Sequence, residues 1–384
     1  MVGIRPAAAQ TTSPIDFIYP ASTRTKSVGG TLLQAPDRTM SNSHTNTPFR
    51  HPVVEKIALA WPPHKWTNTH VLLAISGGAD SVALTRAVWH LKQQSGGDGR
   101  VFVAHFNHRL RGETADRDQA MVATLCQQLG LPFHAGQPQQ PLDEQATDGV
   151  EAAARQARYE FLGQTAQQIG ARLVATGHTS NDQAETVLHR LLRGTGVPGL
   201  AGIRFTRPLV PDISLVRPLL CAWRVEIEDY LSTLGQTYCT DPTNTDPRFT
   251  RNRLRHDLLP KLRRDYNERV DRALVRLAQQ ATEAQAFVDA AVHGLVEDCV
   301  TVNPTKKQVV IHGKALRGQP MLISRELCKR AWTTNGWPLQ AMGFDQWQEL
   351  ARMAVADLEG WSINLPGEIR AERCGEQLVL TRQR

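Results

Sequence analysis

The sequence predicts an α/β protein, in which a parallel five-stranded sheet with helices on both faces is followed by a helical linker and a small α+β C-terminal domain. Between residues 52 and 235, short apolar runs alternate with segments of helical periodicity, a pattern typical of βαβ units. The run from Val71 to Ile75 is apolar throughout, as expected of a strand buried on both faces. Beyond residue 236 the alternation stops and the chain becomes strongly basic, which indicates a separate part of the molecule.

The alternating part yields five strands and five helices. Strands are expected at 71–75, 101–106, 131–135, 172–177 and 215–218. Helical patterns occur at 80–94, 115–129, 149–169, 181–192 and 222–235. Right-handed crossovers between parallel strands would place these helices on both faces of the sheet.

Pattern and composition divide the whole chain into four segments. Residues 1–50 are rich in Ser, Thr, Pro and Asn without periodicity, so we expect a disordered extension, with Met40 as an alternative start. The α/β domain follows at 51–245, and the basic segment and linker helices follow at 246–300, with one long helix at 266–298. In the last segment, 301–384, helices are expected at 321–335 and 343–356 and a hairpin at 368–382.

Composition limits the classes of protein to consider. With 41% apolar and 21% charged residues, the chain is an ordinary globular protein. No apolar run approaches the ~18 residues of a membrane span, so we expect no membrane partner and a cytoplasmic location. The net charge of +7 permits a nucleic-acid partner. The six cysteines form no C-x-x-C pair, which disfavours zinc ribbons, iron–sulfur clusters and dithiol redox sites.

The turn SGGADS at 76–81 links the first strand to the first helix. Its backbone N–H groups and the hydroxyls of Ser76 and Ser81 can surround an anion at the positive end of that helix. Asp80 would repel such an anion unless a divalent cation lay between them, so it is a candidate Mg²⁺ ligand. The structural alternative is a helix N-cap formed by Ser76 or Asp80.

Two more polar clusters follow predicted strands, HFNHRLR at 105–111 and TGHTSNDQAET at 176–186. In the first, histidines and arginines can donate to phosphate or base, although His105 also suits a satisfied core position. In the second, His178 and Asp182 could hold a metal or an amine substrate, whereas compensation of the helix dipole is the alternative. Because ligands bind beyond the carboxyl ends of parallel strands, three such clusters predict one site.

Arginines stand out in two helical patterns. Arg155 and Arg158 share a helix face with Glu151, and they could bind phosphate through their planar guanidinium groups or form ordinary surface pairs. The second pattern, at 248–264, has seven Arg or Lys residues against one acid, Asp257. Such a segment attracts RNA phosphates without sequence preference, or it is a solvated basic helix.

Taken together, these motifs resemble those of the tRNA(Ile)-lysidine synthetases, a family of PP-loop ATP pyrophosphatases with an adenine nucleotide alpha hydrolase-like fold. The resemblance covers roughly 70–265. It includes EAAARQARY (151–159), LLRGTGVPGL (191–200), RPLL (217–220), DPTN (241–244) and RNRLRHDLLPKL (251–262), in addition to the three clusters above. The N-terminal extension has no counterpart in that family, and the C-terminal region is shorter than in its longest members.

The resemblance implies an enzyme that uses ATP and Mg²⁺ to join free L-lysine to the wobble cytidine of the CAU anticodon in tRNA(Ile). ATP would adenylate the C2 oxygen of the cytidine and release pyrophosphate. The ε-amine of lysine would then attack C2 and expel AMP, leaving lysidine. Residues 301–384 would bind tRNA, and a homodimer is compatible with the resemblance.

The family pattern also implies roles for individual residues. ATP would contact the turn and the following strand through Ser76, Gly77, Gly78, Ala79, Asp80, Ser81 and His105, and Asp80 would bind Mg²⁺. Catalysis would involve Asp80, His178, Asp182 and Arg155 or Arg158, the choice between these arginines being open. The tRNA would contact His108, Arg111, Arg193, Arg251, Arg253 and Arg255, of which the last three would engage the anticodon or close over the active site.

Other activities would make different demands on the sequence. A tRNA thiolase of the same PP-loop group usually needs a cysteine pair, and the chain has no C-x-x-C motif. An amide-forming ligase for a small metabolite would leave the basic segment unexplained. An RNA-binding module without catalysis would not need the combination of Ser76, Asp80, His178 and Asp182.

Overall fold

The computed structural model describes residues 50–109, 113–138, 150–240, 250–305, 307–339, 341–357 and 360–383. The chain forms two compact units, Met1–Ala278 and Gln279–Arg384. This boundary lies inside a helix, and the basic segment belongs to the first unit. The predicted domain boundaries at 245 and 300 stay predictions. The expected disordered extension, except for residue 50, and the DPTN motif at 241–244 lie outside the described residues.

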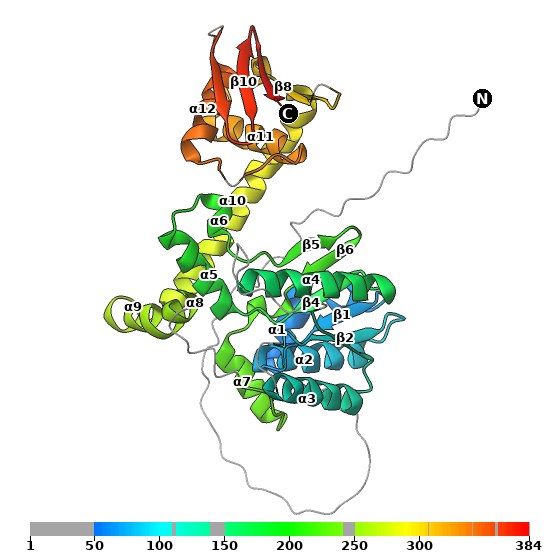
Figure 1. Ribbon diagram of the computed structural model, residues 1–384. Helices are drawn as coiled ribbons and strands as arrows, with labels where there is room; N and C mark the ends of the chain where they lie inside the picture. The colour runs from blue at the N-terminus through cyan, green and yellow to red at the C-terminus, as the bar shows by residue number, and fades with distance from the viewer. Residues whose placement is uncertain are drawn as a thin grey trace, which may run out of the picture. The chain divides into compact units, whose positions relative to one another are not determined.

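A six-stranded sheet forms the centre of the first unit, in the order β3-β2-β1-β4-β6-β5 (Figure 1). The strands are β1 (Val71–Ala74), β2 (Val101–Phe106), β3 (Phe133–Gly136), β4 (Leu173–Thr176), β5 (Thr206–Val210) and β6 (Ile213–Val216). Five of them are parallel, which confirms the predicted α/β sheet.

The predicted number of five strands is wrong, because β5 adds an antiparallel edge strand beside β6. Its sequence, TRPLV, contains Pro208 and Arg207 and therefore carries no strand signal. A proline is tolerated in an edge strand, where its missing N–H has no partner to lose.

Alternate residues of β1 point into two different cores, as a strand covered on both faces requires. Leu73 packs with Val88 of helix α2 (Ala79–Ser95) in one core. Leu72 packs with Leu162 of helix α4 (Val150–Gln168) in the other. Figure 1 shows α2 and α3 on one side of the sheet and α4 on the other.

The helices of this unit lie close to their predicted positions. They are α2, α3 (Glu113–Leu129), α4, α5 (Ser180–Leu192) and α7 (Arg224–Thr233). Two helices were not predicted, α1 (Pro52–Ala60) and the single turn α6 (Val197–Leu200). The first is capped by His51 and begins with a proline, and its apolar side packs against α2 and α7.

The parallel strands bring the predicted polar clusters to one edge. Ala74 at the end of β1 lies in register with Ala104 of β2 and Thr176 of β4. The turn at 76–81, the loop after β2 and the loop after β4 therefore leave the sheet side by side. HFNHRLR starts inside β2, so His105 is a strand residue.

The basic segment is helical but irregular. It consists of α8 (Thr250–Arg253), a π-helical turn (Leu254–Leu258) and α9 (Leu259–Asp265), and the long helix α10 (Val270–Cys299) follows. Leu254 and Leu259 are buried against Ala184 and Val187 of α5. This apolar contact holds the segment on the helix that carries Asp182.

The second unit contains a five-stranded antiparallel sheet in the order β7-β8-β11-β10-β9. Its strands are β7 (Val300–Asn303), β8 (Gln308–His312), β9 (Ser362–Leu365), β10 (Ile369–Cys374) and β11 (Gln377–Arg382). Helices α11 (Met321–Thr334) and α12 (Phe344–Val355) pack with this sheet around a core that includes Trp332 and Trp347. The α+β class and the hairpin, which turns at Gly375, are confirmed.

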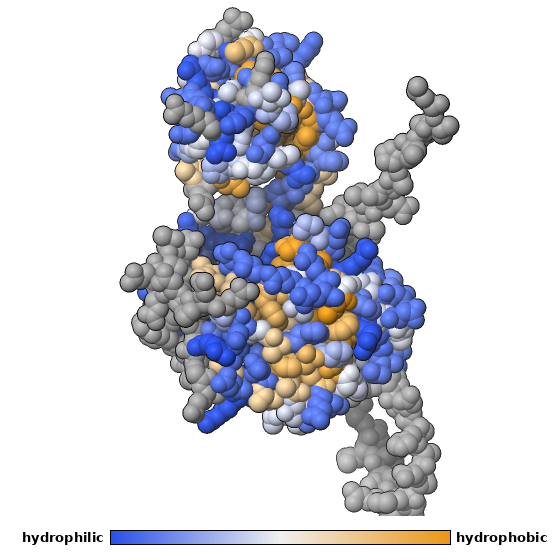
Figure 2. Space-filling view, turned by 45° about the vertical axis from the view of Figure 1, so that its right-hand side comes forward, coloured by the Kyte–Doolittle hydropathy of each residue, from blue (hydrophilic) through white to orange (hydrophobic). Residues whose placement is uncertain are grey.

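One face of the molecule shows where hydrophilic and apolar side chains gather. In the view of Figure 2, blue hydrophilic side chains surround a limited band of apolar ones on the larger unit. None of the helices in the described ranges combines the length and apolar character that crossing a bilayer demands.

Candidate functional site

The turn between β1 and α2 is organised around the hydroxyl of Ser81. This hydroxyl accepts hydrogen bonds from the backbone N–H groups of Ser76 (3.3 Å) and Gly77 (3.2 Å) and donates to the carbonyl of Gly78 (2.9 Å). Gly77 has a φ of +95°, a conformation that strains other residues. Ser81 is buried. Its hydroxyl therefore shapes the loop, and Ser76 is the exposed serine of the turn.

The loop after β4 approaches this turn closely at Gly177. A Cβ atom there would lie 3.0 Å from the backbone carbonyl carbon of Asp80 and 3.1 Å from the N of Ser81. Only a glycine allows such contact without displacement of the turn. This contact brings the two polar motifs, SGGADS and TGHTSNDQAET, into one site.

His105 lies below the turn, inside β2. Its Nδ1 is 2.9 Å from the carbonyl oxygen of Ile75, the residue before Ser76. Burial lowers the pKa of His105, which favours the neutral ring. The side chain is 4% exposed, so the structure places it as a support of the turn, and its predicted contact with ATP stays a prediction.

Asp80 forms an ion pair with Arg224, a residue that sequence reasoning missed. Arg224 Nη2 lies 2.5 Å from Asp80 Oδ2, and the Asp80 Oδ1 atom is buried without a hydrogen-bond partner among the described residues. Burial raises the pKa of the Asp80 carboxyl, although Arg224 acts in the opposite direction. A buried carboxylate oxygen without a partner fits a cation that the loop shares with a phosphate.

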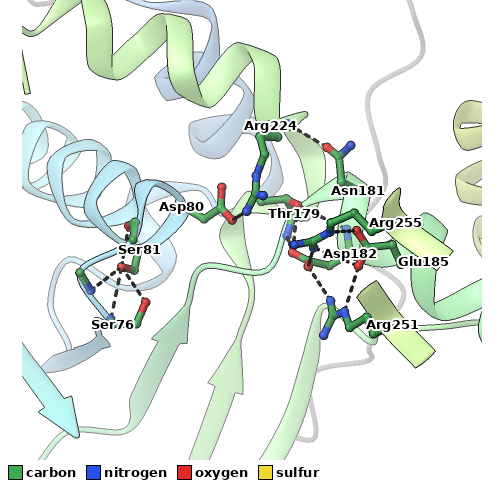
Figure 3. A network of polar contacts seen from close by, with 12 residues as sticks. Ser76, Asp80, Ser81, Thr179, Asn181, Asp182, Glu185, Arg224, Arg251 and Arg255 are labelled. Atoms are coloured by element: carbon green, nitrogen blue, oxygen red, sulfur yellow. Dashed lines mark hydrogen bonds and ion pairs between the residues drawn. The ribbon is translucent and has the colours of Figure 1, made fainter. Parts of the chain in front are cut away.

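Asp182 has two roles at the start of α5 (Figure 3). Its Oδ2 accepts the backbone N–H of Thr179 at 2.8 Å, which completes a capping box with Thr179 as the N-cap. Its Oδ1 lies 2.5 Å from Nη2 of Arg251 and 3.3 Å from Nη2 of Arg255. Burial opposes ionisation, but Arg251, the N–H of Thr179, His178 and Arg255 together hold the pKa of Asp182 below its usual value.

Glu185, one turn further along α5, faces the same two arginines (Figure 3). Its Oε2 is 2.9 Å from Nε of Arg251, and its Oε1 is 2.6 Å from Nε of Arg255. The Glu185 side chain is only 3% exposed. The pair Asp182 and Glu185 is therefore a buried anionic site that already accommodates cationic groups.

His178 lies next to this site with its ring held by Thr176, whose Oγ1 is 2.9 Å from His178 Nδ1. Burial lowers its pKa to about 4, and Arg217, Arg251 and Arg158 act in the same direction, whereas Asp182 opposes the shift. At neutral pH the ring is therefore uncharged, so one of its nitrogens can accept a hydrogen bond.

Arginines from three elements surround Tyr159 on α4. The guanidinium carbons of Arg155, Arg158 and Arg207 lie 5.0, 5.4 and 4.9 Å from the ring centroid. Arg217 follows β6, is 3% exposed, and has an Nε without a hydrogen-bond partner among the described residues. Because Arg158 and Arg217 both lower the pKa of His178, this cationic group extends to the site and suits a phosphate.

The remaining predicted RNA-binding residues are less engaged. His108 stacks edge-on against Phe106 with ring centroids 4.9 Å apart. Arg193 is exposed at the end of α5 and Arg253 is exposed on α8. Arg111 lies outside the described residues. Within the described ranges, no group of three His, Cys, Asp or Glu side chains is arranged as a metal site.

A basic concavity adds to the cationic surface of the first unit. It has a volume of about 400 Å³ and is lined by Trp223, Arg269, Arg272, Val275 and Arg276. Trp223 is the residue before Arg224, which pairs with Asp80. An indole beside three guanidinium groups suits a nucleotide base and its phosphate.

Comparison with known proteins places this arrangement in a family. A model described as a PP-loop domain matches residues 51–262. The chain is 34% identical to the tRNA(Ile)-lysidine synthase of Geobacter sulfurreducens over 82% of this chain and 65% of that protein. It is 32% identical to the tRNA(Ile)-lysidine synthase of Rhodopirellula baltica over 82% of this chain and 87% of that protein.

The chain belongs to the PP-loop family of tRNA(Ile)-lysidine synthases. Its match spans slightly less than two thirds of the Geobacter relative. The U34-tRNA thiolase NcsA of Methanococcus maripaludis has a TM-score of 0.51 at 16% identity, over 60% of this chain and 78% of that chain. At this identity the likeness concerns the fold alone. The family membership that the sequence motifs indicated is therefore confirmed.

The lowered pKa of His178 predicts how the stability of the protein depends on pH. Between pH 6.5 and about pH 4 the unfolded chain binds a proton that the folded chain excludes, so folding becomes less favourable as the pH falls through this window. His178→Gln should therefore flatten the curve of Tm against pH over this range. Thermal denaturation measures it, with His189→Gln on the following helix α5 as control, and an unchanged slope in His178→Gln would contradict the prediction.

Proposed function

We propose that the chain joins L-lysine to C2 of the wobble cytidine in the CAU anticodon of tRNA(Ile), in two steps of which the first consumes ATP, in the cytoplasm. The observation that carries the proposal is the contact at Gly177, which joins a phosphate-binding turn to a buried carboxylate pair. ATP chemistry and binding of an amine would thus take place within one site. The names of the curated relatives agree with this activity.

In the first step, the turn at 76–81 would bind the pyrophosphate half of ATP through backbone N–H groups at the start of α2. Asp80, whose Oδ1 has no hydrogen-bond partner in the described part of the chain, would hold Mg²⁺, and this ion would supply charge neutralisation for the leaving group. Arg158 and Arg217 would stabilise charge near the α-phosphate, where the cytidine C2 oxygen forms its bond and pyrophosphate leaves. The position of Arg158 near His178 supports it over Arg155 for this role.

In the second step, Asp182 and Glu185 would bind an ammonium group of lysine. The attacking ε-amine must be uncharged, and the neutral ring of His178 can accept the proton that the nitrogen loses. The new C2–N bond forms as the C2–O bond to AMP breaks. Water would be scarce at this point, since Glu185 is buried and His178 is half-buried.

The direct test supplies the protein with ATP, radiolabelled lysine and a tRNA(Ile) transcript with a CAU anticodon. Label that becomes stably attached to the RNA, together with AMP and pyrophosphate in equal amounts, is the expected result. A transcript with another wobble base and a reaction without ATP are the controls. Transfer of sulfur instead of lysine would favour a thiolase, and neither product would contradict the proposal.

The RNA itself would bind through exposed cationic groups, with a contribution from residues 301–384 and with the protein as a monomer or a homodimer. Arg253 is exposed on α8, and its Nη2 donates to Thr250 at 3.1 Å. Arg253→Gln should weaken RNA binding and reduce the slope of log K against log salt by about 1. Filter binding at several salt concentrations measures this slope.

Arg172→Gln is the matched control for this measurement. Arg172 is exposed and precedes β4, at the edge of the sheet opposite the site. A salt slope that stays the same in Arg253→Gln would mean that α8 does not contact the RNA backbone.

A further inference from the structure

Arg251 and Arg255 occupy the carboxylates that the proposed function assigns to the lysine ammonium. Three of the four carboxylate oxygens of Asp182 and Glu185 accept from these guanidinium groups. The fourth, Oδ2 of Asp182, accepts the N–H of Thr179. Each oxygen of the pair therefore already has a donor from the chain itself, as Figure 3 shows.

An ammonium group and the two guanidinium groups compete for this pair. The Asp182 and Glu185 side chains are 12% and 3% exposed, so the charges interact with little screening by water. Two arginines and an ammonium would place three positive charges around two negative ones. Lysine can therefore bind well only when at least one guanidinium group leaves.

The arginine side chains can move without releasing the helix that carries them. Leu254 and Leu259 anchor the basic segment against Val187 of α5, whereas the Arg251 side chain is 48% exposed. The turn from Leu254 to Leu258 is π-helical. Pro260, which follows this turn, has no backbone N–H to donate in a regular helix. Such turns occur often at functional sites. A change of rotamer at 251 and 255 is therefore enough to open the pair.

RNA is the substrate that can draw these arginines away. Its phosphates offer the paired oxygens that a guanidinium group binds best. The exposed Arg253 between the two arginines gives the RNA backbone a first contact on the same segment. Lysine itself, being cationic, can only repel them.

We infer that Arg251 and Arg255 are positioning residues that keep the lysine site closed until RNA phosphates bind them. The inference rests on the proposed function and gives its order of events. RNA binds first, the two guanidinium groups turn towards its backbone, and the carboxylate pair becomes available to lysine. Lysine would then meet a cytidine that is already in place.

Equilibrium binding of L-lysine without ATP tests this coupling, because no reaction then occurs. Isothermal titration of the full-length protein should give a lysine Kd at least about tenfold lower when the CAU transcript is saturating. By reciprocity, saturating lysine should tighten RNA binding by the same factor. A lysine Kd that is independent of RNA overturns the inference.

The double variant R251Q/R255Q removes both guanidinium groups. Its lysine Kd without RNA should fall at least about tenfold and should no longer change when RNA is added. Arg172→Gln is the control, since this exposed residue precedes β4 at the edge of the sheet opposite the site, and it should retain the RNA dependence of lysine binding. A double variant that still needs RNA for tight lysine binding contradicts the inference. Where that variant fails to fold, the wild-type titration decides alone.

The two proposals fail in different ways. If wild-type protein does not attach labelled lysine to the transcript, the proposed function is wrong. If it attaches lysine but binds it equally well without RNA, the enzyme assignment stands and only the closing role of Arg251 and Arg255 is wrong.

Discussion

Substituting Asp80 with Asn should lower the rate of pyrophosphate release by about 10²–10³-fold or more while leaving RNA affinity nearly unchanged. The carboxylate lies at the start of α2, and its Oδ1 has no hydrogen-bond partner among the described residues. An amide of the same size keeps the shape of the turn but cannot bind a divalent cation as an anion can. Phosphate charge would then remain without compensation during attack on the α-phosphorus.

The same substitution should not unfold the protein. Burial raises the pKa of Asp80, which means that the folded chain accommodates the ionised form less well than water does. The Arg224 side chain, left without its partner, is 39% exposed and can be hydrated. We therefore expect a Tm close to that of the wild type, measured by thermal denaturation.

Asp98→Asn is the matched control for Asp80→Asn, because Asp98 is exposed beyond the other end of α2. It should leave the release of pyrophosphate and the binding of RNA unchanged. If Asp80→Asn retained normal ATP turnover but lost RNA affinity, Asp80 would belong to the RNA surface and the assignment of the turn would be wrong.

The sequence predicted the position of the site because that position follows from local rules. An apolar strand, a glycine pair and a helix start are all visible in 71–81, and parallel strands must bring such turns to one edge. The capping box of Thr179 and Asp182 that the structure shows at the start of α5 also conforms to a local pattern, S/T-x-x-acid. These features need no knowledge of distant contacts.

Partners that come from distant parts of the chain could not be predicted. Arg224 reaches Asp80 across 144 residues of sequence, and Arg217 reaches the Tyr159 cluster from the strand next to α4. Both lie in stretches whose local pattern only indicates a strand end and a helix. No spacing rule connects them with the residues that they serve.

In the basic segment, composition suggested a role in RNA binding but did not reveal the ion pairs that its arginines form with α5. Seven Arg or Lys residues at 248–264 predicted RNA binding, but Arg251 and Arg255 pair with carboxylates of α5 in the structure. The alternation of these arginines with Leu254 gave no sign of this, because the pairing depends on how Leu254 and Leu259 dock. The one sign of this pairing in the sequence was a second acidic residue, Glu185, three positions after Asp182 and therefore on the same face of the helix.

Glu185→Gln should raise the KM for lysine by about 10²-fold or more, because it removes one of the two charges that would bind the lysine ammonium in a buried site. The first step needs only ATP and the cytidine, so adenylated RNA should still form and should accumulate. Quench-flow analysis with ATP labelled at the α-phosphate measures both steps. The side chain is 3% exposed, so water cannot replace the lost charge.

Glu160→Gln on α4, where the carboxylate accepts from Gln156, is the control and should change neither step. The distinction between the steps carries the argument about Glu185. A purely structural role, in which this carboxylate only anchors Arg251 and Arg255, would slow adenylation and lysine attack to the same extent and would leave the KM for lysine unchanged. In Glu185→Gln, adenylated RNA should accumulate and excess lysine should convert it to product. This result is expected only if Glu185 binds the amine.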